Sequence, residues 1–182
     1  MAKLAAKTYG DSLFELALEE GKLEILLEEA KFVEQVLAEN EDLVKLMTHP
    51  KVGKDEKQNV IENIFKSKVS DDMTGFLVIV IKKGRFNEMK AILSYFIARV
   101  KEYKKIGVAF VTTAVELRDE QRKALEKRLI ETTKYETMEM NYATDSSLLG
   151  GMVVRIGDRV VDSSIKQKLN DLTRELLKIQ LA

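Results

Sequence analysis

Residues 148–164 have the sequence LLGGMVVRIGDRVVDSS, and this stretch decides whether the second half of the chain is a nucleotide-binding unit or a small sheet. A P-loop needs two glycines separated by four residues and followed by Lys and Ser or Thr, because the lysine and the hydroxyl meet the phosphate and its magnesium. Here Gly157 follows Gly151 by six positions, and Asp158 places a negative charge where a phosphate would bind. The stretch instead predicts a β-hairpin whose two-residue turn at Gly157 and Asp158 is of type II′.

Pairing Ile156 with Arg159 across this turn fixes the expected register of the hairpin. It makes Arg155 and Asp162 diagonal neighbours on one face, near enough for their side chains to meet. This pair would fix the register and aim Asp162 at the start of the following helix as a cap, or it would form a charged site for a partner protein. The Gly150-Gly151 pair predicts a bend or a close approach of two backbone segments.

Upstream of the hairpin, the hydrophobic period changes from helical to alternating. Residues 107–114 (GVAFVTTA) are rich in β-branched side chains, which favours a strand, and residues 118–132 form a charged amphipathic helix. Apolar residues alternate with polar ones over residues 138–142, which indicates a second strand, and Ser163 or Ser164 can cap a final helix. The order β, α, β, β, β, α predicts a small mixed sheet with helices packed on it.

The first part of the chain is predicted to be almost wholly helical. Apolar residues recur at helical spacing in six segments, which glycines and the single proline, Pro50, separate. Ser70 followed by two aspartates marks the start of the fifth segment. The predicted class is therefore mainly α, with a six-helix bundle over residues 1–105 followed by a small α+β domain with a mixed sheet over residues 106–182.

The composition excludes several classes of function. The chain has 30 basic and 30 acidic residues, so no net field draws it to nucleic acid or to an anionic membrane. It has no cysteine and a single histidine, His49 before Pro50, which excludes thiolate and histidine-cluster metal sites. No apolar run approaches the length of a membrane span, and the start lacks the features of a signal peptide. We therefore expect an intracellular protein with no catalytic residues, no metal and no cofactor.

The hairpin resembles the signature of the ATP synthase delta subunit family, which includes the mitochondrial oligomycin sensitivity-conferring protein. The signature residues are Gly150, Gly151, Ile156, Gly157, Asp158, Asp162 and Ser164. The resemblance extends over the whole chain, with further matches at TYGDSLFELALEEGKLE (residues 8–24), MTHPKVGKDEK (47–57), KKGRFNEM (82–89) and TTAVELRDEQRKALEKRL (112–129). The chain departs from the family pattern at Gly10 and Asp11, where a small residue and a lysine are more usual, and at Ser163, where glycine is common.

The resemblance implies a non-catalytic stator subunit, present in one copy per complex at the cytoplasmic face of a bacterial plasma membrane. The helical bundle would sit on the catalytic head and receive the amino-terminal helix of an alpha subunit in a groove between its first and fifth helices. The smaller domain would engage the carboxy-terminal ends of the b subunits, so the chain would meet the membrane only through its partners. The complex makes ATP from ADP and phosphate using proton flow, and this chain would hold the head still against the torque of the rotor.

The fifth predicted helix gives independent support for such a groove. Residues 71–84 (DDMTGFLVIVIKKG) are apolar on more than one face, and surplus apolar surface is typical of a helix-binding groove. The alternative is a central helix that is buried on every side. The residues expected to line the alpha-subunit groove are Tyr9, Ser12, Leu13, Leu16, Phe76, Ile79, Val80 and Lys83.

The chain ends in LLKIQLA (residues 176–182), which is more apolar than a solvated tail. The residues expected to contact a b subunit are Leu176, Leu177, Ile179 and Leu181. Fraying of the tail or its packing against the sheet is the alternative. Two other functions stay open at this point: a nucleotide-binding protein that uses the hairpin from Gly150 to Asp158, and a free-standing helical interaction module unrelated to ATP synthase.

Overall fold

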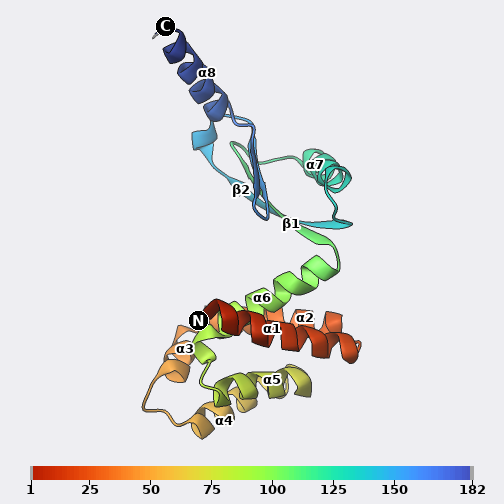
Figure 1. Cartoon of the computed structure of the whole chain (residues 1–182), viewed down its shortest axis with the longest axis vertical. Coiled ribbons are helices and arrows are strands. Elements are labelled where there is room, and N and C mark those ends of the chain that lie inside the picture. Colours follow the sequence, from red (N-terminus) through yellow and green to blue (C-terminus); the bar gives the residue numbers. More distant parts are fainter. Residues whose placement is uncertain (1, 181–182) are drawn as a thin grey trace. The chain divides into compact units, whose positions relative to one another are not determined.

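The computed structural model describes residues 2–180, and the chain divides between Tyr103 and Lys104 into two compact units (Figure 1). The first unit contains six α-helices and one short 3-10 turn. Their bounds are α1 (Ala2–Glu19), α2 (Leu23–Glu39), α3 (Glu41–Thr48), α4 (Lys54–Phe65), α5 (Asp71–Lys82), η1 (Phe86–Glu88) and α6 (Met89–Tyr103). The predicted bundle of six helices is confirmed.

Local signals set the boundaries of these helices. α3 ends at Thr48 because His49, the residue before Pro50, adopts an extended backbone. The turns after α1 and α5 contain Gly21 and Gly84, which have φ angles of +64° and +68°. Both glycines supply a left-handed conformation that other residues adopt only with strain.

The core of the first unit is built around α6. α1 and α2 pack chiefly on α6, and α4 packs chiefly on α5. The largest side chains that are fully enclosed include Leu13, Leu26, Phe65, Leu77 and Phe96. Each of these five side chains is exposed by 1% or less, so the unit has a continuous apolar interior of its own.

The second unit is a four-stranded mixed sheet with two helices, in the predicted order β, α, β, β, β, α. Its elements are β1 (Ile106–Thr113), α7 (Asp119–Thr132), β2 (Thr137–Thr144), the 3-10 turn η2 (Ser146–Leu148), β3 (Met152–Ile156), β4 (Arg159–Asp162) and α8 (Ile165–Gln180). The strands lie in the order β2-β1-β3-β4. β1 is parallel to β2, whereas β1 with β3 and β3 with β4 are antiparallel.

The two faces of this sheet differ in their cover. Ala109 and Val111 of β1 are buried at 0% and 1% exposure, on the face where α7 packs against β2. The guanidinium of Arg122 in α7 lies 4.9 Å from the ring centre of Tyr142 in β2 on that side. Phe110, which points to the opposite face, is 45% exposed.

Candidate interaction surfaces

Hydrogen bonds and an ion pair connect the start of α5 to α2 and to the turn that precedes α2. The backbone N–H and the hydroxyl of Ser70 both donate to the Glu29 carboxylate at 2.7 Å, and the Ser70 hydroxyl accepts from Met73 N–H at 3.3 Å, as predicted for a cap. Lys22 Nζ lies 2.7 Å from Asp72 Oδ2. Hydrogen bonds to Asp72 and then Glu20 raise the pKa of the Lys22 ammonium above its usual range. α5 is thereby held at a fixed rotation about its axis.

This rotation leaves apolar surface of α5 in solvent. Ile79 is 51% exposed and Val78 is half-buried, and Gly75, one turn earlier on the same side, is exposed. A methyl group added at Gly75 would meet nothing within 4 Å. The helix is therefore not buried on every side, and the outward surface of Gly75, Val78 and Ile79 is flat enough for another helix to approach closely.

Of the eight residues predicted for the alpha-subunit groove, five are accessible to solvent and three are buried. Ser12, Ile79 and Lys83 are exposed, and Tyr9 and Leu16 are half-buried against the core. The prediction also named Leu13, Phe76 and Val80 as lining residues, but these three are exposed by only 1%, 8% and 0%. They belong to the apolar interior, because they lie on the sides of α1 and α5 that face the other helices.

Gly10 and Asp11, where the chain departs from the family pattern, both contact Tyr95 of α6. A Cβ at Gly10 would lie 2.4 Å from Tyr95 Cδ1, so only glycine lets the ring rest on the α1 backbone. Tyr95 Oη donates to Asp11 Oδ1 at 3.0 Å. Burial, followed by this hydrogen bond, raises the pKa of the Tyr95 phenol. These contacts lock α1 to α6.

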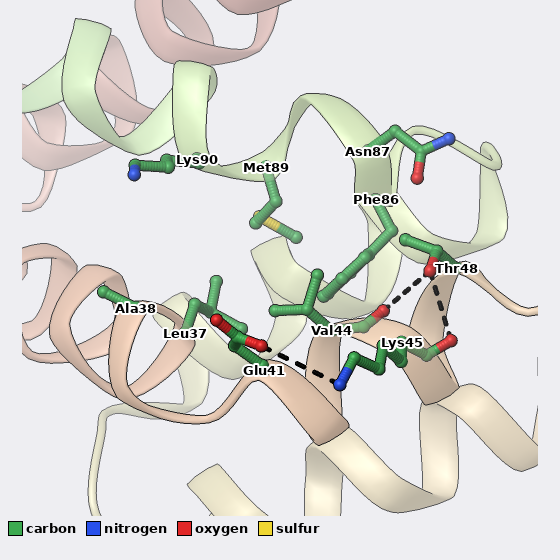
Figure 2. Close-up of a pocket in the computed structure, with 10 residues that line it drawn as sticks. All are labelled: Leu37, Ala38, Glu41, Val44, Lys45, Thr48, Phe86, Asn87, Met89 and Lys90. Carbon is green, nitrogen blue, oxygen red and sulfur yellow. Dashed lines mark hydrogen bonds and ion pairs between the residues drawn. The ribbon is translucent and has the colours of Figure 1, made fainter.

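A hollow of about 490 Å³ opens elsewhere on the first unit, between the end of α2, α3 and the start of α6 (Figure 2). Its apolar lining consists of the buried side chains of Phe86 and Met89 and the half-buried Leu37 and Val44. Its rim carries the exposed pair Glu41 and Lys45, with Lys45 Nζ 3.8 Å from the carboxylate. The hollow thus combines an apolar interior with polar side chains at its rim.

The hairpin has the predicted register, with Ile156 opposite Arg159. Gly157 has a φ of +56°, as the first central position of a type II′ turn requires. Gly151 has a φ of +77°, and a Cβ there would lie 2.4 Å from the Ser163 carbonyl oxygen. The Gly150-Gly151 pair therefore serves a close approach, because the Ile165 side chain at Gly150 and the Ser163 backbone at Gly151 occupy the space that a Cβ would need.

Asp162 and Arg155 do not pair, in contrast to the contact expected from the register. Asp162 Oδ1 accepts from Ser164 N–H at 2.9 Å, and Ser164 Oγ accepts from Gln167 N–H at 3.1 Å, so the two residues cap α8 together. Hydrogen bonds from the Ser164 hydroxyl and then from its N–H hold the pKa of the Asp162 carboxyl below its usual range. Arg155 stacks instead on Phe110, with its guanidinium carbon 4.8 Å from the ring centre.

The final helix carries an apolar stripe at four- and three-residue spacing. Ile165, Leu169 and Leu172 are 46%, 50% and 53% exposed. The side chains of Leu176, Leu177 and Ile179, and the whole of Leu181, which were predicted to contact a b subunit, lie outside the described part of the structure. That contact stays a prediction.

Within residues 2–180, no group of His, Asp and Glu side chains is arranged to hold a metal ion. Over the same residues, no helix combines the length and apolar character that crossing a membrane requires. The fold defines a two-unit protein that exposes apolar side chains on helices and on one face of its sheet.

Comparison with known proteins identifies the family. The model of the family "ATP synthase delta (OSCP) subunit" matches residues 5–176. The chain is 56% identical over the full length of both chains to the ATP synthase subunit delta of Lachnoclostridium phytofermentans. It is 36% identical to that of Desulforamulus reducens, over 94% of each chain. The fold also matches a chain in a cryo-EM structure of the Toxoplasma gondii mitochondrial ATP synthase hexamer, with a TM-score of 0.76 over 94% of this chain and 97% of that one, at 17% identity.

The chain belongs to the ATP synthase delta (OSCP) subunit family. It is accordingly a non-catalytic subunit of the peripheral stalk of an F-type ATP synthase. Within this subunit the glycine-rich hairpin shapes the second unit.

Proposed function

We propose that this subunit grips two partners at once and holds the catalytic head of a proton-translocating ATP synthase against rotor torque. Its first unit binds the amino-terminal helix of an alpha subunit, and its second unit binds the carboxy-terminal ends of the b subunits. One copy serves each complex, at the cytoplasmic face of the plasma membrane, which it reaches through its partners. Bacterial relatives named as the delta subunit support this assignment.

The observation that carries the alpha-subunit site is the outward apolar face of α5. Ile79 is 51% exposed on a helix whose start is fixed by Glu29 and Lys22. A rigid, solvent-exposed apolar strip with an adjacent glycine suits a helical ligand, because the ligand gains apolar contact and the strip loses little conformational entropy. Lys83 at the end of α5 offers a cation to such a ligand, and Tyr9, Ser12 and Leu16 form the α1 side of the site.

The mechanism is bivalent attachment. Two modest binding sites joined in one chain give a high effective concentration for the second contact once the first is made. The assembly then withstands torque through several contacts, none of which has to be exceptionally strong. No cofactor takes part, and the apolar residues at the end of α8 are the proposed b-subunit contact within the second unit.

Co-purification tests this proposal. The tagged full-length chain is mixed with separately produced alpha subunit and with the soluble part of a b subunit, and we expect it to retain each of them. A free-standing interaction module would retain neither. A nucleotide-binding protein would show micromolar affinity for ATP or ADP in a titration, whereas we expect no saturable binding by this chain.

A further inference from the structure

Among the residues that the structure describes, a helix packs on one face of the sheet of the second unit and leaves the other face open. α7 packs on the face to which Ala109 and Val111 point. On the opposite face, Phe110 is 45% exposed and Val160 is 59% exposed. The open face therefore combines exposed apolar side chains with polar ones such as Asn141 and Arg155.

The open face is hollowed and draws on all four strands. Its cavity has a volume of about 420 Å³. The register explains why its side chains share one side of the sheet, since Phe110 pairs with both Asn141 and Arg155, and Arg155 pairs with Val160. The residues that line it include Phe110, Asn141, Ala143, Val153, Arg155 and Val160.

One positive charge on this face has no acidic partner. Arg155 stacks on Phe110, and no carboxylate of the described residues forms an ion pair with it. Asp162, the acid that the register brings nearest, uses its carboxylate to cap α8. The Arg155 guanidinium stacked on the Phe110 ring, together with the apolar side chains of the cavity, is suited to a ligand that combines apolar groups with a carboxylate.

We propose that this open face docks an amphipathic helix whose apolar stripe covers Phe110 and Val160 and whose Asp or Glu meets Arg155. A helix is the fitting occupant because helices cover the faces of sheets, whereas added strands extend their edges. The inference rests on the proposed function, under which the helix comes from a b subunit, and it adds a contact on the sheet to the one proposed at the end of α8. A second copy of this chain is disfavoured, because two copies meeting through this face would bring two unpaired arginines together.

Neighbouring residues of the hairpin give matched controls. Val160 and Val161 are adjacent on β4, 59% and 64% exposed, and point to opposite faces of the sheet. Arg155 and Arg159 are likewise exposed on opposite faces. A synthetic peptide with the carboxy-terminal sequence of the b subunit is titrated calorimetrically into the full-length chain and four variants. These are Arg155→Glu, Arg159→Glu, Val160→Asn and Val161→Asn.

We expect Arg155→Glu to weaken peptide binding at least tenfold and Val160→Asn about fivefold, by loss of charge pairing and of apolar contact respectively. Arg159→Glu and Val161→Asn are expected to stay within twofold of the unsubstituted chain. Arg155→Lys, which keeps the charge, is expected to retain most of the affinity. Circular dichroism melting curves identify any variant that is not folded. If an arginine variant is unfolded, the affinities of Val160→Asn and Val161→Asn are compared instead.

Three results would overturn the inference. If the unsubstituted chain binds the peptide and the Arg155 and Val160 variants bind it equally well, the helix docks elsewhere while the proposed function stands. If the unsubstituted chain binds no b-subunit peptide, the proposed function fails and this inference fails with it. If the chain sediments as a dimer that Val160→Asn separates, a second copy covers the face.

Discussion

Replacing Ile79 by aspartate tests the alpha-subunit site directly. Full burial of an isoleucine side chain contributes about 1.5–3 kcal/mol, so covering the 51% of Ile79 that is exposed is worth about 1 kcal/mol. Ile79→Ala should therefore weaken binding of an alpha-subunit amino-terminal peptide about fivefold. Ile79→Asp also buries a carboxylate without a partner, which costs several kcal/mol more, so we expect a loss of about 100-fold or greater.

The assay is a calorimetric titration of the peptide into the full-length chain, with helical content followed by circular dichroism. Ile25 on α2 gives a matched control, because it is also a helical isoleucine and is 55% exposed. We expect Ile25→Asp to leave the affinity within twofold. Unchanged affinity of Ile79→Asp would refute the assignment of the site to α5, and an equal loss in both variants would show that the charge acts non-specifically.

Three further predictions concern the stability of the fold. Gly10→Ala should destabilise the first unit by about 1–3 kcal/mol because the new methyl group lies 2.4 Å from the Tyr95 ring, whereas Gly75→Ala should stabilise it by about 0.5–1 kcal/mol, as denaturant unfolding would measure. Gly151→Ala should destabilise the second unit by more than about 1 kcal/mol, because its φ is +77° and a backbone carbonyl occupies the space, and calorimetric melting would detect it. The Asp162 carboxyl has a pKa below its ordinary value of 3.8 in the folded chain, so its contribution is complete above pH 3.8 and is lost as the pH falls through the lowered pKa. The protection of amides at the start of α8, measured relative to their intrinsic exchange rates, should therefore decrease as the pH falls through the lowered pKa in the natural chain and not in Asp162→Asn.

The sequence by itself determined the elements of this protein and their order. The helix boundaries follow from short-range signals, such as the hydroxyl of Ser70, the extended residue before Pro50 and the left-handed Gly84. The hairpin register also follows from local chemistry, because a two-residue turn at Gly157 leaves one way of pairing the flanking strands. These features depend on atoms that are close along the chain, so the pattern of residues is sufficient to predict them.

Only the tertiary structure decided which side chains remain available to a partner. From Gly75 to Ile81 every residue of α5 is non-polar, and the sequence gives no reason to expose Ile79 while burying Val80; packing against the neighbouring helices makes that choice. The same holds for Arg155, which lies on Phe110 because β1 pairs with β3, while Asp162 is drawn away to cap α8. Exposure and pairing of this kind depend on residues distant in sequence, and for that reason the contact surfaces emerge only once the chain is folded.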